Sequence, residues 1–305
     1  SLTFFIQTSF TQSDNEDSTS LCDDGIYEIA PTQYGAKGSF WIATREGLCR
    51  YNPIDDNFIR CSKLNAQEVD YFYSVHEDKN GRVWLGTRGE GVKIYYPYQQ
   101  KAVSYPYNPE NEKSVSNNHV FRIYQSPTDI FWFGTLKGGI NKYDPYRKKF
   151  IHYKFPNHHP THNRILSFYQ DTNNYYWIGT RGGGLMKILR CDTSQNMVEK
   201  GLSQSDFESH CRKEQQQVFH YQLEENASDK FNKNDIYDIN QIEKGSIWLG
   251  TSEGLFIFDT KKGEATHARE IQSIPDSSVF RKFVYFIYKD PQYSGRLFWL
   301  GTSNG

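Results

Sequence analysis

The chain has 305 residues, a length that suits one large all-β domain or two ordinary domains. Its formal net charge is −1, so charge gives no indication of nucleic acid or an anionic membrane surface as a partner. Aromatic residues make up 16% of the sequence, which favours β-strands with a buried face. No stretch of about 18 apolar residues occurs, so the sequence predicts no membrane-spanning helix.

All six Trp residues belong to one recurring stretch, which is clearest in FWFGTLKGGINKYD, Phe131–Asp144. In every copy a Thr follows three residues after the Trp, and a Gly-containing turn comes next. The copies contain Trp41, Trp84, Trp132, Trp177, Trp248 and Trp299, which are 43, 48, 45, 71 and 51 residues apart. A period of roughly 40–50 residues built from short strands is typical of a β-propeller. We therefore predict an all-β fold of four-stranded antiparallel blades.

The third repeat shows the expected strands best. They are Val120–Tyr124, Phe131–Thr135, Ile140–Tyr143 and Phe150–Tyr153. The pair Gly138-Gly139 supplies the positive φ that a tight hairpin between the second and third strands needs. The Trp of the second strand is expected to pack between neighbouring blades, where a large flat side chain buries much area.

The other repeats follow in chain order. Ser1–Phe10 is expected to be a lone fourth strand from a preceding blade. Repeats are expected at 26–61, 73–105, 120–153, 165–221 and 236–268, with an incomplete one at 284–305. The fourth repeat carries a polar insertion at 189–217, which we interpret as a surface excursion with room for a short helix. We interpret 1–305 as a fragment of one propeller domain, and its open sheet edges are expected to favour association.

The five Cys residues contain no CxxC pair, which argues against a zinc site. Cys49 and Cys61 lie on two expected strands joined by a short turn, so they are candidates for a cross-strand disulfide. Cys191 and Cys211 bracket the insertion and could also pair, which leaves Cys22 over. The alternative is that all of these are free thiols.

The segment SVSNNHVFRIYQSPTDIFWFGTLKGGINKYDP, Ser114–Pro145, resembles the regulator-propeller repeat of periplasmic sensor domains in hybrid two-component systems of Bacteroidetes. The similarity lies in the order of strand, turn, a "WIGT"-like second strand, Gly-Gly and "YDP", and it recurs along nearly the whole chain. Two departures are WIATREG, which begins at Trp41, and the insertion in the fourth repeat.

This resemblance implies a periplasmic sensor domain whose parent chain is a histidine kinase of the inner membrane. In such parents a propeller of usually seven blades precedes an immunoglobulin-like sandwich, a membrane helix, the kinase and a response regulator. The implied ligand is a small molecule or oligosaccharide, often a carbohydrate or its breakdown product, and the implied assembly is a homodimer. The resemblance implies membrane attachment only through segments outside this chain.

Candidate binding residues lie in the loops at one end of the blades, where the second-to-third-strand hairpins and the connections between blades emerge together. Guanidinium and ammonium groups there suit carboxylate, sulfate or sugar hydroxyls. The candidates are Arg45, Arg88, Lys137 and Arg181 at the hairpin tips, and Tyr107, His158, His159 and His162 in the connections. The alternative is that the charges are solvated hairpin tips. Three nearby His residues could also ligate a metal, but no carboxylate or Cys completes a set, so we predict no metal and no cofactor.

No catalytic motif is present: GxSxG, a P-loop and HExxH are all absent from the sequence. We therefore expect ligand sensing without catalysis in this fragment. Two alternatives stay open, namely a propeller-fold lyase or glycosidase, whose acid–base residues can come from any blade, and a protein-interaction platform.

Overall fold

The computed structural model describes residues 20–61, 71–126, 129–144, 148–153, 163–173, 175–189, 219–221, 223, 235–270, 283–289 and 298–302. The chain divides at Ile165 into two compact units. We call the described residues up to Ile165 the N-terminal unit and those from Leu166 onward the C-terminal unit. The expected strand at Ser1–Phe10 and nearly all of the insertion at 189–217 lie outside the described residues.

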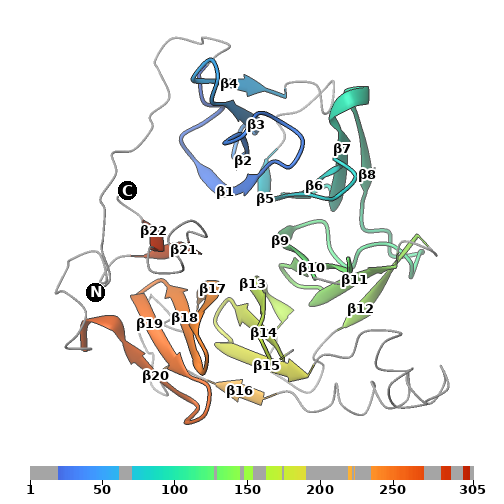
Figure 1. The fold of residues 1–305 in the computed structure, drawn as a ribbon. Coiled ribbons are helices and arrows are strands. Elements are labelled where there is room, and N and C mark those ends of the chain that lie inside the picture. The colour runs from blue at the N-terminus through green and yellow to red at the C-terminus, as the bar shows by residue number, and fades with distance from the viewer. Residues whose placement is uncertain are drawn as a thin grey trace, which may run out of the picture. The chain divides into compact units, whose positions relative to one another are not determined.

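The N-terminal unit consists of three four-stranded antiparallel sheets, each made of four strands in chain order (Figure 1). The first blade has β1 (Ile26–Pro31), β2 (Phe40–Thr44), β3 (Gly47–Asn52) and β4 (Asn57–Arg60). The second has β5 (Phe72–Glu77), β6 (Val83–Thr87), β7 (Val92–Tyr96) and β8 (Lys101–Tyr105). The third has β9 (Val120–Gln125), β10 (Phe131–Thr135), β11 (Ile140–Asp144) and β12 (Lys149–Tyr153).

The C-terminal unit continues the same pattern. Its first blade has β13 (Ile165–Gln170), whose first residue belongs to the N-terminal unit, β14 (Tyr175–Thr180), β15 (Leu185–Leu189) and β16 (Phe219–Tyr221). The next has β17 (Ile236–Glu243), β18 (Ser246–Thr251), β19 (Gly254–Asp259) and β20 (Glu264–His267). A two-stranded sheet of β21 (Val284–Lys289) and β22 (Phe298–Thr302) follows. The prediction of four-stranded propeller blades is confirmed.

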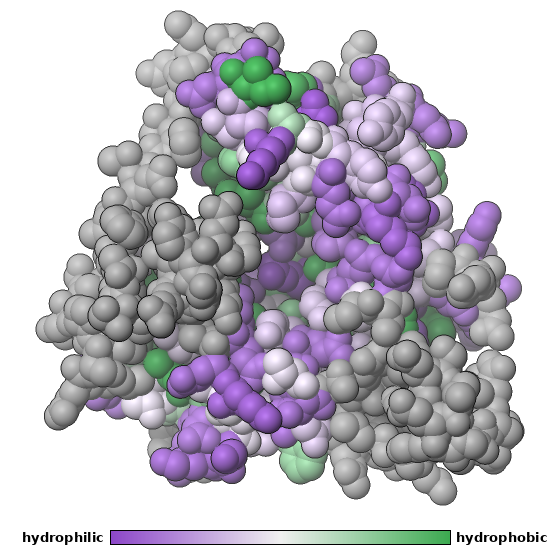
Figure 2. All heavy atoms as spheres, in the orientation of Figure 1, coloured by the Kyte–Doolittle hydropathy of each residue, from purple (hydrophilic) through white to green (hydrophobic). Residues whose placement is uncertain are grey.

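Helix contributes little to the described part of the chain. The helical elements whose bounds are described are two three-residue 3-10 helices, η1 (Pro97–Gln99) and η3 (Ala268–Glu270). None of the described helices has the length and apolar character to cross a bilayer. On the face shown in Figure 2 the described residues are mainly hydrophilic, as expected when apolar side chains are enclosed between sheets.

Each Trp lies on the second strand of its blade, and the side chains of four of them pack against the next blade. Trp41 shares a buried cluster with Phe72 and Leu85 of the second blade, and Trp84 shares one with Phe131 and Phe133 of the third. The same holds in the C-terminal unit for Trp177 and Trp248, whose clusters include residues of the following sheet. The expectation that Trp packs between blades is confirmed for these four residues, and the side chain of Trp299 lies outside the described set.

The Thr of the recurring motif closes the hairpin between the second and third strands. The Oγ1 atoms of Thr87, Thr135 and Thr180 donate hydrogen bonds of 2.9 Å to the carbonyl oxygens of Gly91, Gly139 and Gly184, respectively. These glycines have φ between 74° and 77°, a region that side chains with a Cβ disfavour. The motif therefore closes the hairpin by contacts between residues four positions apart.

The Gly before that Thr lets the next blade approach closely. A Cβ added to Gly86 would lie 2.5 Å from the Val120 carbonyl oxygen in the third blade. In the C-terminal unit a Cβ on Gly250 would lie 2.7 Å from the Val284 carbonyl oxygen. The first blade has Ala43 at this position, and its Cβ is enclosed in the cluster shared with the second blade. The Ala of WIATREG is thus accommodated in the core between the first and second blades.

Short polar contacts connect the first strands of successive blades. The Glu28 carboxylate accepts hydrogen bonds from the Ser74 hydroxyl and from the Val75 N–H, at 2.9 Å for the latter. Ser74 in turn accepts a 3.0 Å bond from the Ile123 N–H. In the C-terminal unit Asp238 accepts a 2.8 Å bond from the Ile287 N–H in the same way. In these three blades a polar side chain of one first strand thus holds the first strand of the next.

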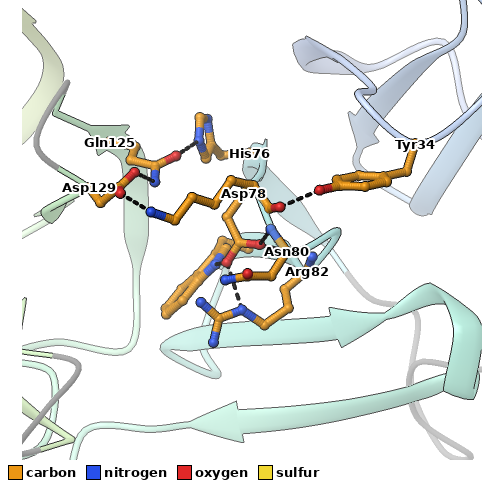
Figure 3. Close-up of polar contacts among 9 residues, drawn as sticks. Tyr34, His76, Asp78, Asn80, Arg82, Gln125 and Asp129 are labelled. Atoms are coloured by element: carbon orange, nitrogen blue, oxygen red, sulfur yellow. Dashed lines mark hydrogen bonds and ion pairs between the residues drawn. The ribbon is translucent and has the colours of Figure 1, made fainter.

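The turns between first and second strands form a second set of contacts at the opposite end of the blades (Figure 3). Lys79 pairs with Asp129, and Tyr34 donates to the Lys79 carbonyl oxygen, so the turns of three blades are connected. Asp78, within the second turn, accepts bonds from the Arg82 Nε at 2.7 Å and from the Trp84 indole at 2.8 Å. Asp171 holds Trp177 in the same way at 2.8 Å.

The cysteine pairing differs from the prediction. Cys49 forms a disulfide with Cys22, and Cys61 is a free thiol. The register explains why, since Cys49 lies opposite Arg60 and Cys61 is the next residue, so Cys61 faces the other side of the sheet. Cys61 packs against the cluster of Trp41, whereas Cys49 lies in a cluster with Leu21 and Cys22. Cys191 and Cys211 lie outside the described residues.

Candidate functional site

The hairpin arginines are positioned by backbone bonds to the start of the first strand in the same blade. The Arg45 N–H donates to the Gly25 carbonyl at 3.1 Å, and the Arg88 N–H donates to the Tyr71 carbonyl at 3.0 Å. Because these carbonyls precede β1 and β5, both arginines lie beside the residues that open those strands. The loop end of the N-terminal unit therefore combines hairpin cations with side chains of the first strands.

Arg45 is held by a buried carboxylate. Its Nη2 lies 3.1 Å from Asp23 Oδ2, and the side chains of Arg45 and Asp23 are 58% and 6% exposed, respectively. The other Asp23 oxygen accepts a 2.6 Å bond from the Gly25 N–H. The hydrogen bond that Arg45 donates to Asp23 is the main cause that raises the pKa of the Arg45 guanidinium. Asp23 thus holds the guanidinium of Arg45 at one nitrogen, while more than half of the side chain stays open to solvent.

Arg88 lies over an aromatic cluster that we define by Tyr27, Tyr71, Tyr73 and Phe121. The Arg88 Cζ is 4.9 Å from the Tyr71 ring centroid. The Tyr27 centroid is 5.2 Å from that of Tyr71 and 5.4 Å from that of Tyr73, and the Tyr73 and Phe121 centroids are 4.2 Å apart. The cluster spans β1, β5 and β9, so it exists only because three blades are adjacent.

Tyr27 is the most exposed hydroxyl-bearing member of this cluster, with 42% of its surface accessible. Its hydroxyl contacts the Tyr71 hydroxyl. Burial, and next the hydrogen bond to Tyr71, raise the pKa of Tyr27 to about 12, while Arg45 and Arg88 act in the opposite direction. The phenol is therefore neutral at physiological pH and can both donate and accept hydrogen bonds.

Two guanidinium groups lie beside the aromatic cluster. Arg45 is opposed by Asp23 and by the charge of Glu46, whereas Arg88 contacts the Tyr71 ring. Glu28 adds no net charge, because its Oε1 pairs with Arg122 Nη1 at 2.7 Å. An exposed aromatic face with guanidinium groups beside it suits a ring-shaped ligand that carries hydroxyls and a carboxylate or sulfate.

The other sequence-predicted residues of the N-terminal unit lie apart from this cluster. Lys137 is exposed at the tip of the β10–β11 hairpin, and among the described contacts none joins it to the cluster. Tyr107 is 43% exposed in the connection before β9, where its N–H donates to Asn118 Oδ1 at 2.6 Å. The nearby Tyr105, on β8, was not among the candidates and packs against the core cluster that contains Phe150, with ring centroids 6.4 Å apart.

Arg181, in the C-terminal unit, has its own set of neighbours. Its Nε lies 4.0 Å from Asp235 Oδ2, and its side chain is 54% exposed. Asp235 directly precedes β17, and Tyr237 follows two residues later. The Tyr237 and Tyr285 centroids are 5.4 Å apart at an interplanar angle of 66°. Burial, and then the charge of Asp235, raise the pKa of Tyr237 to about 12.

The three candidate histidines, His158, His159 and His162, lie outside the described residues. Within the residues that the structure describes, no group of three or more His, Cys, Asp or Glu side chains is arranged to hold a metal ion.

The aromatic residues of the first strands were missed from the sequence, although a signal was present. The second residue of the first strand is aromatic in five of the six repeats, as Tyr27, Tyr73, Phe121, Tyr237 and Tyr285, and is Leu166 in the fourth. A strand residue that is aromatic at the same place in most repeats, beside a hairpin cation, would have pointed to this surface.

Two segments of the chain, residues 68–89 and 160–182, match the sequence model described as the two component regulator propeller. No curated protein sequence matches the chain significantly.

Solved structures with the same fold include extracellular domains from B. thetaiotaomicron. The domain assigned to the hybrid two component system BT3049 is 22% identical with a TM-score of 0.64, over 91% of this chain and 32% of that one. The domain assigned to BT4673 is 19% identical with a TM-score of 0.63, over 96% of this chain and 34% of that one. This chain thus spans about a third of the length of each.

The same fold also occurs in an enzyme. A catalytically inactive virginiamycin B lyase from Staphylococcus aureus, solved with quinupristin, is 10% identical with a TM-score of 0.56, over 93% of this chain and 80% of that one. The blade architecture therefore accompanies more than one kind of function, and the site has to distinguish them.

Proposed function

We propose that this chain is the extracytoplasmic ligand-sensing part of a two-component receptor, and that it binds an acidic carbohydrate or carbohydrate breakdown product at the aromatic cluster. The observation that carries the proposal is the exposed Tyr27 ring, which lies beside Tyr71 and Tyr73 with Arg45 and Arg88 at its edge. Tyrosine presents a rigid ring and a hydroxyl at low entropic cost, and Arg supplies paired donors for a carboxylate.

The location follows from two independent lines of support. The Cys22–Cys49 disulfide is typical of an oxidising compartment, because cytosolic proteins keep most thiols reduced. The fold is also that of the two extracellular domains from B. thetaiotaomicron. We infer a periplasmic position, with the histidine kinase elsewhere in the parent protein.

Signalling requires that the ligand bind one state of the receptor better than another. The blades are poor candidates for the moving part, because close-packed sheets deform little. We therefore place the change at the contact between two sensor chains, in a homodimer of the intact receptor. The aromatic cluster then serves binding, and the chain-to-chain contact serves the switch.

The proposal is tested by calorimetric titration with galacturonic acid oligomers and neutral glucose oligomers. Tyr27→Ala and Arg88→Gln should each weaken binding of the acidic oligomer about tenfold or more, as expected for central aromatic and Arg contacts. Matched controls are Tyr98→Ala, which removes a ring that is 81% exposed outside the site, and Lys101→Gln, on an exposed position of β8.

Three outcomes would contradict the proposal. One is the absence of binding by the unaltered chain, and a second is equal loss in the control variants. The third is release of cleaved or unsaturated sugar products in the titration cell, which would favour a lyase or glycosidase over a sensor.

A further inference from the structure

The three strands that carry the aromatic cluster each have a β-bulge at an aromatic residue. The register of β1 with β2 passes from Ile26 to Glu28 and skips Tyr27. The registers of β5 with β6 and of β9 with β10 skip Tyr73 and Phe121 in the same way. A bulge re-aims the extra side chain and leaves that residue outside the regular hydrogen-bond ladder. The ladder within a blade therefore does not by itself fix where these three rings lie.

The residues that follow the bulges, Glu28, Ser74 and Arg122, belong to one polar network. Glu28 Oε2 accepts hydrogen bonds from the Ser74 hydroxyl and, at 2.9 Å, from the Val75 N–H. Ser74 Oγ accepts a 3.0 Å bond from the Ile123 N–H. Glu28 Oε1 lies 2.7 Å from Arg122 Nη1, and the side chains of Glu28 and Arg122 are 16% and 24% exposed, respectively. The network thus joins β1, β5 and β9 directly beside the aromatic residues of these strands.

The ion pair extends farther than the attachment of neighbouring strands requires. Ser74 holds the first strand of the third blade with a single oxygen, and Glu28 Oε2 does the same for the second blade. Glu28 Oε1 reaches past β5, which lies between β1 and β9, to Arg122 in the third blade. Because the pair is partly buried, salt and water screen it less than a surface pair. It therefore constrains how the first and third blades lie at the level of the bulges.

We propose that Glu28 and Arg122 are positioning residues for the binding site, and that their ion pair holds the bulges of the first and third blades so that Tyr27, Tyr73 and Phe121 form one preformed surface. Neither side chain contacts the ligand in this account. A surface that is already in place lowers the cost of ordering side chains when a ligand binds. The effect on ligand affinity rests on the proposed function, whereas the effect on the geometry of the cluster does not.

The first measurement needs no ligand and follows the phenolate absorbance of Tyr27, by difference between each variant and the same variant with Tyr27→Phe. In Arg122→Gln, the loss of a cation would by itself raise the pKa of a nearby phenol, whereas a loosened cluster exposes the phenol and lowers its pKa. We expect the midpoint to fall from about 12 toward about 10. Arg122→Lys keeps the charge and should keep the midpoint near that of the unaltered chain.

The second measurement is calorimetric titration with galacturonic acid oligomers. In Glu28→Gln, the loss of an anion would by itself strengthen the binding of an acidic ligand, whereas a loosened cluster weakens it. We expect about fivefold weaker binding. Lys79→Gln is the control, because it removes an ion pair with Asp129 between the second and third blades at their opposite end. It should change neither the affinity nor the Tyr27 midpoint.

The outcomes separate this inference from the proposed function. A lower Tyr27 midpoint in Arg122→Gln, with weaker binding by Glu28→Gln, supports the positioning role. A raised or unchanged midpoint, or binding by Glu28→Gln that is as strong as before or stronger, overturns it. If the unaltered chain binds no acidic oligomer, the proposed function fails and the midpoints alone decide the inference. Should Arg122→Gln fail to fold, Ser74→Ala breaks the same network without a change of charge, and its Tyr27 midpoint decides.

Discussion

Cys22 is joined to Cys49 by a disulfide with a Cα–Cα distance of 6.0 Å, and Asp23, the next residue, holds the site arginine Arg45. The bond attaches the segment before β1 to the face of the first blade that points away from the second. There Leu21 and Cys22 pack against Ile42 and Cys49. The disulfide therefore serves both the stability of the first blade and the position of Asp23.

Removal of this disulfide should destabilise the N-terminal unit. Cys22→Ser with Cys49→Ser opens a loop of 27 residues, and the expected loss is about 3 kcal/mol in the free energy of unfolding. The measurement is urea denaturation followed by Trp fluorescence. Cys61→Ala is the control, because Cys61 is a free thiol on the opposite side of the sheet, and it should cost about 1 kcal/mol. Equal losses in the two variants would contradict this account.

The Asp78 carboxylate should contribute more to the free energy of unfolding than an ordinary turn residue does, because its side chain is buried and bonded to Arg82 and Trp84 (Figure 3). Asp78→Ala leaves a buried indole N–H without its acceptor, and should cost about 2–4 kcal/mol. A finer comparison is Trp84→Phe against Trp41→Phe. Both remove ring volume, but among the described contacts the Trp41 indole N–H has no hydrogen bond to lose.

We expect Trp84→Phe to be about 1 kcal/mol more destabilising than Trp41→Phe. Chemical denaturation of both variants under the same conditions measures the difference. A larger loss for Trp41→Phe would show that the bond to Asp78 contributes less than the packing.

A Cβ added between two blades and a Cβ removed there should both destabilise the fold, but for different reasons. Gly86→Ala puts a Cβ 2.5 Å from the Val120 carbonyl oxygen, which belongs to the backbone and cannot turn aside, so about 1–3 kcal/mol of stability should be lost. Ala43→Gly, at the same position of the first blade, removes a Cβ that is already accommodated and should cost about 1 kcal/mol through backbone flexibility. Thermal unfolding measures both. If Gly86→Ala were neutral, the close approach of the blades would be wrong.

Tyr27 should lose its phenolic proton at a higher pH than an ordinary tyrosine. Its pKa is raised to about 12 in the folded protein, above the value near 10 in the unfolded chain. The folded state therefore holds the phenolic proton more tightly, and its stabilising contribution is complete below pH 10 and is lost as pH rises through 12. Phenolate absorbance of the unaltered chain and of Tyr27→Phe measures this titration by difference.

Arg88→Gln should raise the pKa of Tyr27 further, because Arg88 favours the phenolate. A difference titration with a midpoint near 10 would indicate that the Tyr27 ring is more solvated than its contacts imply. Lys101→Gln is the control and should leave the midpoint unchanged.

Much of the fold was predictable from the sequence, because the motif that defines a blade is local. Trp, Thr and the glycines of one hairpin lie within about ten residues, and they specify strand, turn and strand by contacts such as that from Thr135 Oγ1 to the Gly139 carbonyl. The same locality placed Arg45, Arg88 and Arg181 at hairpin tips, where the structure has them. These positions follow from strand alternation and turn chemistry, which need no distant partner.

Other features were decided only by the tertiary structure, since their partners are far apart in the sequence. The register pairs Cys49 with Arg60, and because side chains alternate along a strand, Cys61 faces the other side of the sheet. Cys49 therefore forms its disulfide with Cys22. The aromatic cluster joins Tyr27 to Tyr71 and Tyr73 across more than 40 residues, and it forms because β1 and β5 are adjacent. Local sequence determines the strand or turn in which a residue lies and the chemical group that it carries. Packing between blades determines which distant side chain that group contacts, because the contact depends on the register and spacing of all the residues between the two.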